Sequence, residues 1–179
     1  MVSVASTYMI VFRFLHIVSA AFWFGAASLF VGFVGPAAAE VGPSAGPLIA
    51  NMVVKRRLAK VIAGASMMTL VGGALIYWHD YQTLGHSSLS FWVGTPMGLG
   101  LTIGAVVAIV AGYIGYAGVG RNVERLVEVG GQLARSEGPP APDLLERFMH
   151  LQGEIKRHGI IDLILLLIAI ATMSTARYW

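Results

Sequence analysis

The sequence predicts an all-α integral membrane protein: four transmembrane helices in an antiparallel bundle, with an amphipathic cytoplasmic helical segment between the third and fourth helices. Hydrophobic residues make up 56% of the 179 residues and charged residues 12%, with a mean hydropathy of +0.74. Soluble domains carry about 25% charged residues. Four apolar stretches approach or exceed the roughly 20 residues that cross a bilayer. The chain has no cysteine, which excludes disulfides, iron–sulfur clusters and thiolate metal sites.

The predicted spans form a single membrane domain over residues 1–179. We expect the first span to end at Gly35, where a loop rich in glycine and proline begins, and the second to end at His79–Asp80. Arg121 closes the third span, and the fourth contains one acid, Asp162. The spans are 14–35, 61–78, 93–120 and 159–176, with a connector over 121–158.

The connector is predicted to hold two helical segments. Apolar residues recur at helical spacing from Val123 to Leu133, so the third helix should continue as an amphipathic helix that stops near Gly130–Gly131. Asp143, with Glu146 three residues later, is typical of a capping box that opens a new helix. We expect that helix to lead directly into the fourth span.

Basic residues predict the orientation. Ten of the twelve Lys and Arg residues lie in the first and third connections, and basic residues near span ends remain cytoplasmic. Residues 121–158 should therefore be cytoplasmic, with both termini and the 80–90 loop outside, as in a bacterial plasma membrane. The same distribution accounts for the net charge of +3, so we expect no nucleic-acid partner.

Small residues recur at intervals of four along the third span. In lipid, such residues let helix backbones approach closely and hold helices together. The stripe therefore predicts tight helix packing, and it is also compatible with docking another membrane subunit or a second copy of the chain in a homo-oligomer. Its members are Gly100, Gly104, Ala108 and Gly112.

Two histidines form the candidate cofactor site. His16 lies one turn into the first span and His79 ends the second, both on the predicted outer side. Ionisable residues inside a membrane indicate function by default, and imidazole is a common axial ligand of haem iron. We predict a haem b with His16 and His79 as its metal ligands. Arg13, on the face of His16, would meet a propionate, and Gly72, on the face of His79, would leave space for the macrocycle.

Structural roles remain open for the same residues. A histidine at a span end, such as His79, is often an interfacial residue beside aromatic side chains, and His16 could hydrogen-bond across helices. We expect His86, in the outer loop, to be solvated. His150, on the cytoplasmic helix, should face solvent or the lipid headgroups.

One acid lies at the entry of the fourth span. Asp162 shares a helix face with His158, and Lys60 enters the second span at a comparable depth. We predict an Asp162–Lys60 ion pair with a structural role, because a pair lowers the cost of an acid near hydrocarbon. Proton transfer is the alternative role.

The first eighty residues resemble a known family. FLHI at 14–17, followed by AAFWFG at 20–25, is similar to the opening helix of copper-resistance-D-like membrane proteins and of bacterial membrane protoporphyrinogen oxidase. RRLAK at 56–60 and the glycines at 72–73 are also similar. The resemblance implies a small helical bundle in which His16 binds haem b. The oxidase's Trp-x-His-x-Lys element is replaced by FWVGTP at 91–96, so the resemblance implies haem binding rather than the oxidase reaction.

Two functions of different classes follow. The first is a membrane b-type haem protein that takes part in electron transfer between a quinone or protein donor and an acceptor on the outer side. The alternative is a cofactor-free accessory subunit of a larger membrane complex. A third reading, a small transporter, would place Asp162, Lys60 and His158 at a cytoplasmic entrance. The sequence identifies no substrate.

Overall fold

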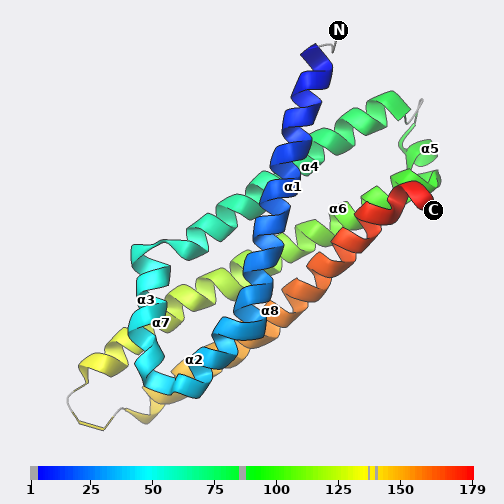
Figure 1. Cartoon of the computed structure of the whole chain (residues 1–179). Coiled ribbons are helices and arrows are strands. Elements are labelled where there is room, and N and C mark those ends of the chain that lie inside the picture. Colours follow the sequence, from blue (N-terminus) through cyan, green and yellow to red (C-terminus); the bar gives the residue numbers. More distant parts are fainter. Residues whose placement is uncertain (1–3, 85–87, 137, 140) are drawn as a thin grey trace.

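The computed structural model of the chain describes residues 4–84, 88–136, 138–139 and 141–179 and contains only helices and short connections in those ranges (Figure 1). The elements in chain order are α1 (Val4–Leu29), η1 (Phe30–Val34), α2 (Gly35–Val41), η2 (Gly42–Ala45), α3 (Gly46–Ala50), η3 (Asn51–Lys55), α4 (Leu58–Leu84), α5 (Leu89–Gly94), α6 (Pro96–Ile114), η4 (Gly115–Gly120), α7 (Arg121–Arg135), α8 (Pro142–Thr175) and η5 (Ala176–Tyr178). His86 lies outside the described residues, as do Glu137 and Pro140 of the linker before α8.

Four of the helical stretches are long and apolar enough to cross a membrane, which confirms the all-helical class and the number of candidate spans. Each predicted span falls largely within one of them. They cover Thr7–Val41, Leu58–Leu84, Pro96–Arg135 and Pro142–Tyr178.

The first helix does not end at Gly35, and this prediction is wrong. α1 passes through the π-helical turn η1 into α2, and the Gly35 N–H bonds to the Phe30 carbonyl five residues back. Pro36 then lies in the first turn of α2, where a missing N–H costs little. The helix ends only at Gly42, whose φ of +68° suits glycine.

The second helix also outruns its predicted end. Arg57, with φ of 53°, turns the chain from η3 into α4, which continues past His79 to Leu84. His79 and Asp80 are therefore helical residues, and the prediction that the second span ends at His79–Asp80 places the helix end too early.

The third span is interrupted, contrary to the prediction of one helix over 93–120. Thr95 has an extended backbone between α5 and α6, and its Oγ1 accepts a hydrogen bond from the Gly98 N–H, which caps α6. Trp92 of α5 is buried and meets Tyr77 of α4 edge-on, with ring centroids 6.0 Å apart. Downstream, η4 carries the helix into α7, which ends at Arg135 rather than near Gly130–Gly131.

α8 runs without a break from Pro142 to Thr175, so the connector helix does lead directly into the fourth span. The predicted capping box at Asp143 and Glu146 is wrong. The N-cap is Ala141, which makes no side-chain cap, and Pro142 occupies the first turn. Asp143 lies inside that turn, where its negative charge interacts favourably with the positive end of the helix dipole.

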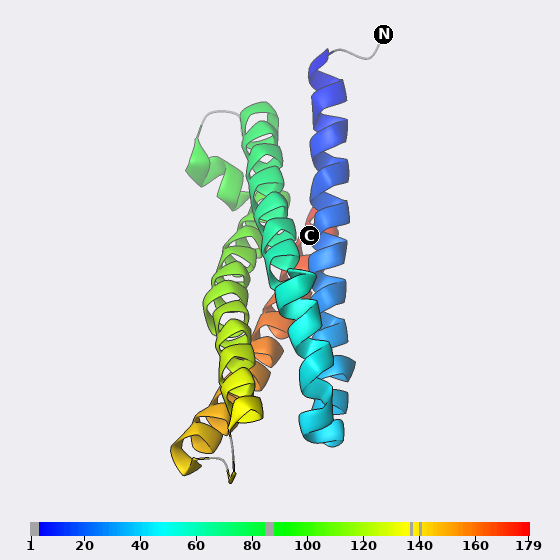
Figure 2. The same cartoon turned by 90° about the vertical axis from the view of Figure 1, so that its left-hand side faces the viewer.

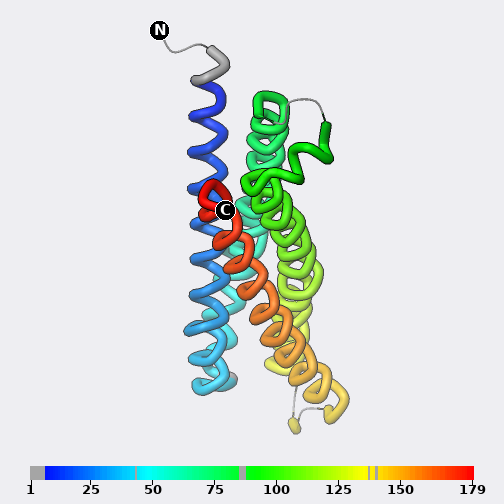
Figure 3. Tube along the Cα trace, turned by 90° about the vertical axis from the view of Figure 1, so that its right-hand side faces the viewer, coloured from blue at the N-terminus to red at the C-terminus, as the bar shows by residue number. Residues whose placement is uncertain are grey.

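The long helices pack in pairs. α1 lies against α4 and α6 lies against α8, while α4 also touches α6 (Figures 2 and 3). Residues of all four helices meet in one core cluster, in which Trp23, Ala111 and Leu166 are buried and Ile62 packs against them. The start of α1, α5 and the end of α8 lie toward one end of the molecule, and α2, α3 and α7 lie toward the other (Figure 1).

The small-residue stripe of α6 faces the interior, which confirms the predicted close packing. A Cβ on Gly100 would lie 2.8 Å from the Ala176 Cβ, and one on Gly104 would lie 2.5 Å from the Met173 Cγ. A Cβ on Gly112 would lie 3.1 Å from a Leu70 methyl carbon. Docking of another subunit on this stripe stays a prediction, and it would require α8, and α4 at Gly112, to move aside.

Candidate functional site

His16 of α1 packs directly onto α4. Its Nδ1 lies 2.8 Å from the Thr69 carbonyl oxygen. The helices come this close because two glycines face His16: a Cβ on Gly72 would lie 3.4 Å from the His16 Cβ, and one on Gly73 would lie 2.9 Å from the His16 Cε1. The space beside Gly72, predicted for the macrocycle, is occupied here by His16 itself.

Two hydroxyl groups join α1 and α4 beside His16. The Thr69 Oγ1 lies 2.9 Å from the Ser19 Oγ, and both residues are buried. Ser19 in turn donates to the Leu15 carbonyl at 2.7 Å. A hydrogen bond between helices contributes about 0.6 kcal/mol on average inside a membrane, so this link helps to hold the helix pair in register around His16.

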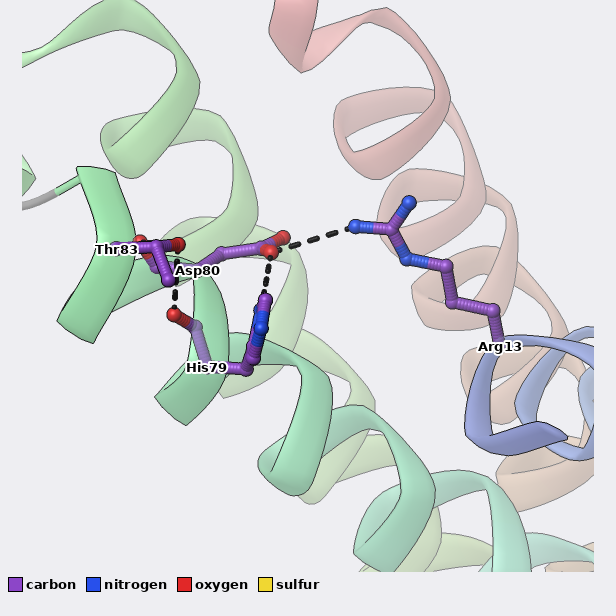
Figure 4. Close-up of polar contacts among 4 residues, drawn as sticks. All are labelled: Arg13, His79, Asp80 and Thr83. Carbon is purple, nitrogen blue, oxygen red and sulfur yellow. Dashed lines mark hydrogen bonds and ion pairs between the residues drawn. The ribbon is translucent and has the colours of Figure 1, made fainter. Parts of the chain in front are cut away.

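Arg13, His79 and Asp80 form a polar cluster between the same two helices (Figure 4). An Arg13 Nη2 lies 3.3 Å from the Asp80 Oδ1, and the His79 Nδ1 lies 3.4 Å from the same oxygen. The Asp80 side chain is only 7% exposed, whereas that of Arg13 is 56% exposed. Thr83 donates to the His79 carbonyl at 2.9 Å. Because an unpaired buried carboxylate is costly, Arg13 stabilises Asp80 where it lies.

Sequence reasoning missed Asp80 and Thr69. The sequence analysis treats Asp80 only as the end of a span, although an acid beside His79 and a lone arginine in the neighbouring helix together indicate an ion pair. Thr69 acts through its carbonyl and hydroxyl, and no motif in the sequence marks that role.

The two predicted ligands, His16 of α1 and His79 of α4, lie on the same side of α4 but at different heights along its axis. His16 lies opposite Gly72, and the seven residues from there to His79 correspond to about 10.5 Å of helix rise. Seven residues are close to two turns, so Gly72 and His79 point the same way. Side chains on a helix lean toward its N-terminus, which brings the His79 ring nearer to His16.

Both rings are held through Nδ1. His16 meets a backbone carbonyl and His79 meets a carboxylate, and within the described part of the chain neither Nε2 has a hydrogen bond. A neutral imidazole that donates from Nδ1 presents a lone pair at Nε2. Metal-binding histidines characteristically have this arrangement, in which a carbonyl or carboxylate fixes the tautomer and the ring orientation.

At the opposite end, Asp162 does not pair with Lys60, and the predicted ion pair is wrong. Asp162 is 4% exposed and faces η4, where a Cβ on Gly115 would lie 3.4 Å from its Oδ1. That oxygen has no hydrogen-bond partner among the described residues. Lys60 is exposed and lines a separate small pocket with Glu124. The glycine-rich turn lets α8 approach so closely that the carboxylate is covered by backbone.

His158 lies one turn before Asp162 on the same face of α8, as predicted. A Cβ on Gly118 would lie 2.7 Å from the His158 Cγ, and the His158 Nδ1 lies 2.8 Å from the Glu154 carbonyl oxygen. His150 is exposed, as expected. The glycines of η4 therefore accommodate both titratable side chains.

No family model matches the chain, and neither a curated protein nor a solved structure matches it. The likeness to copper-resistance-D-like proteins therefore stays an expectation based on the first eighty residues.

Proposed function

We propose that the protein is a b-type haem protein of a bacterial plasma membrane that takes part in electron transfer, and that His16 and His79 are the residues that would hold the haem iron. A haem held there supplies an iron that accepts and releases one electron. The chain's own residues orient the two imidazoles and pair the charge of Asp80 with Arg13. A quinone or a protein donor would deliver the electron, and an acceptor on the outer side would take it.

The observation that carries the proposal is the engagement of both Nδ1 atoms by oxygen acceptors. His16 meets the Thr69 carbonyl at 2.8 Å and His79 meets the Asp80 carboxylate at 3.4 Å. Each ring therefore keeps its Nε2 free for iron. Gly72 has no part in the proposed site, because His16 occupies the space beside it.

The Arg13–Asp80 pair supports this role electrostatically. One guanidinium nitrogen pairs with Asp80, and Arg13 remains more than half exposed. Its other N–H groups are available to a propionate, whose carboxylate matches a guanidinium. The Asp80 carboxylate accepts a hydrogen bond from the His79 Nδ1 and so orients the His79 ring.

We further propose that the four helices cross the membrane with both termini outside and residues 121–158 in the cytoplasm. Ten of the twelve basic residues support this orientation. The structure groups the elements that contain them, α2 to the start of α4 and α7 to the first half of α8, toward one end (Figure 1).

Absorption spectra of ligand variants test the assignment. His16→Ala should abolish the low-spin haem spectrum, and His79→Ala should convert remaining haem to a five-coordinate, high-spin form. His150→Ala is the matched control, because this exposed histidine lies on the far connector, and its spectrum should equal the wild type. A low-spin spectrum that survives His79→Ala would contradict His79 as the second ligand.

One observation favours the alternative, a cofactor-free accessory subunit. α1 and α4 are in contact at Gly72, so a macrocycle must lie beside this contact rather than within it. The absorption spectrum of the purified protein distinguishes the two functions, since a cofactor-free accessory subunit from haem-replete cells should show no Soret band.

A further inference from the structure

A cavity lies between α6, η4, α7 and α8, at the end of the molecule opposite His79. Its volume is about 620 Å³, which falls in the usual range of small-molecule sites. None of the residues in the proposed haem site lines it. The lining residues that matter below are Ile114, Ala117, Arg125, Arg147, Leu151 and Glu154.

The charged end of this cavity carries surplus positive charge. Arg125 and Arg147 line it from α7 and α8, and neither has a carboxylate within 4.0 Å among the described residues. Among the described residues, Arg125 forms a hydrogen bond with the neutral side chain of Asn122, at 3.3 Å. Glu154, the acid in the described lining, lies 3.8 Å from Arg157 and 3.5 Å from the His158 Nδ1.

Apolar side chains also line this cavity. Ile114 and Ala117 line it from α6 and η4, and Leu151, which is 7% exposed, lines it from α8. From Ile114 to Arg125 the helical path rises about 16 Å. The cavity therefore places apolar side chains beside two guanidinium groups that have no carboxylate partner among the described residues.

We propose that this cavity binds the phosphate head of an anionic membrane lipid. The two arginines match phosphate oxygens in a bidentate manner, and the apolar residues contact the upper part of the acyl chains. Basic pockets between membrane helices on the cytoplasmic side suit anionic headgroups. The proposal does not depend on haem, because it uses other residues at the other end of the chain.

Thermal unfolding of the purified full chain in neutral detergent tests the site. The probes are dioctanoyl phosphatidylglycerol, dioctanoyl phosphatidylcholine and sodium phosphate, and native mass spectrometry counts bound lipid. Phosphatidylglycerol should raise the unfolding midpoint at a concentration at least tenfold lower than either other probe. In Arg125→Gln/Arg147→Gln, its half-saturating concentration should rise at least tenfold.

Arg121→Gln/Arg135→Gln is the matched control, because both residues are exposed on α7 and neither lines the cavity. Its half-saturating concentration should change less than twofold. If the double cavity variant does not fold, Arg147→Gln alone serves, since it breaks no interaction with a described side chain. Equal affinity for the two lipids, or unchanged affinity in the cavity variants, would overturn the proposal. Equal affinity for sodium phosphate would overturn its assignment to a lipid.

Discussion

Single polar residues join the first two long helices of this protein. Asp80 is nearly buried and has one strong cation, Arg13, from the neighbouring helix. His16 and Thr69 add a hydrogen bond across the same contact. The candidate histidines could be selected from the sequence, because ionisable residues in apolar spans are rare. Their partners could not, because pairing depends on the register between α1 and α4.

Removing the Arg13 cation should destabilise the protein. Arg13→Gln leaves Asp80 without its main partner, and we expect a loss of about 1–3 kcal/mol in unfolding free energy, since one buried partner loses its counter-charge. Arg13→Gln/Asp80→Asn should recover part of that loss because no buried charge remains. Equilibrium unfolding in detergent measures both. If Arg13→Gln matches the wild type, the pair is not stabilising.

Lys60 and Asp162 should show no energetic coupling. The sequence predicts that they pair, but in the structure Lys60 is exposed and Asp162 faces Gly115. In a double-mutant cycle with Lys60→Ala and Asp162→Asn, the interaction term should stay within about 0.5 kcal/mol, as for independent sites. The Arg13–Asp80 cycle is the positive control. Coupling of similar size in both cycles would restore the predicted pair.

Helices were predictable in number but not at their ends. Apolar length identifies a span because about 20 residues are needed to cross hydrocarbon, and that constraint does not depend on neighbours. Ends depend on local geometry. In the sequence, Pro36 predicts the end of a helix. In the structure it follows a π-helical turn and lies in the first turn of α2, where its missing N–H does not stop the helix. Thr95 reads as an ordinary span residue, yet it caps α6 after an extended backbone.

The packing of α6 yields a prediction at this scale. Gly104→Leu and Gly112→Leu insert side chains at positions where an added Cβ alone would lie 2.5 and 3.1 Å, respectively, from a neighbouring side-chain atom. Overpacking of this kind costs about 1–3 kcal/mol, so the thermal midpoint in detergent should fall. Gly64→Leu on α4 is the control, because no atom lies within 4 Å of a Cβ there. Equal midpoints for all three variants would contradict the packing of α6 on its neighbours.

Across the whole molecule, the arrangement places one candidate site toward each end. The histidine pair and Arg13 lie between α1 and α4, and the basic cavity lies between α7 and α8. The sequence alone indicated the first, from intramembrane histidines. It could not indicate the second, because Arg125 and Arg147 come from separate helices that only the fold brings together.

Orientation can be measured in the natural cysteine-free background. Ser90, in α5, and Ser136, directly after α7, are both exposed and lie on either side of the third helical stretch. An impermeant maleimide should label Ser90→Cys in intact cells and Ser136→Cys only after the membrane is opened, because basic residues near span ends favour a cytoplasmic location of their connections. Labelling of both in intact cells would contradict the proposed crossing.

The most direct test of the proposed function is the absorption spectrum of the purified full chain from haem-replete cells, oxidised and then reduced with dithionite. Two histidine ligands predict a low-spin iron, so a Soret band should be present and sharp α and β bands should develop on reduction. A protein of correct mass and intact helical content that shows no Soret band in either state would contradict the haem assignment and leave the accessory-subunit function in its place.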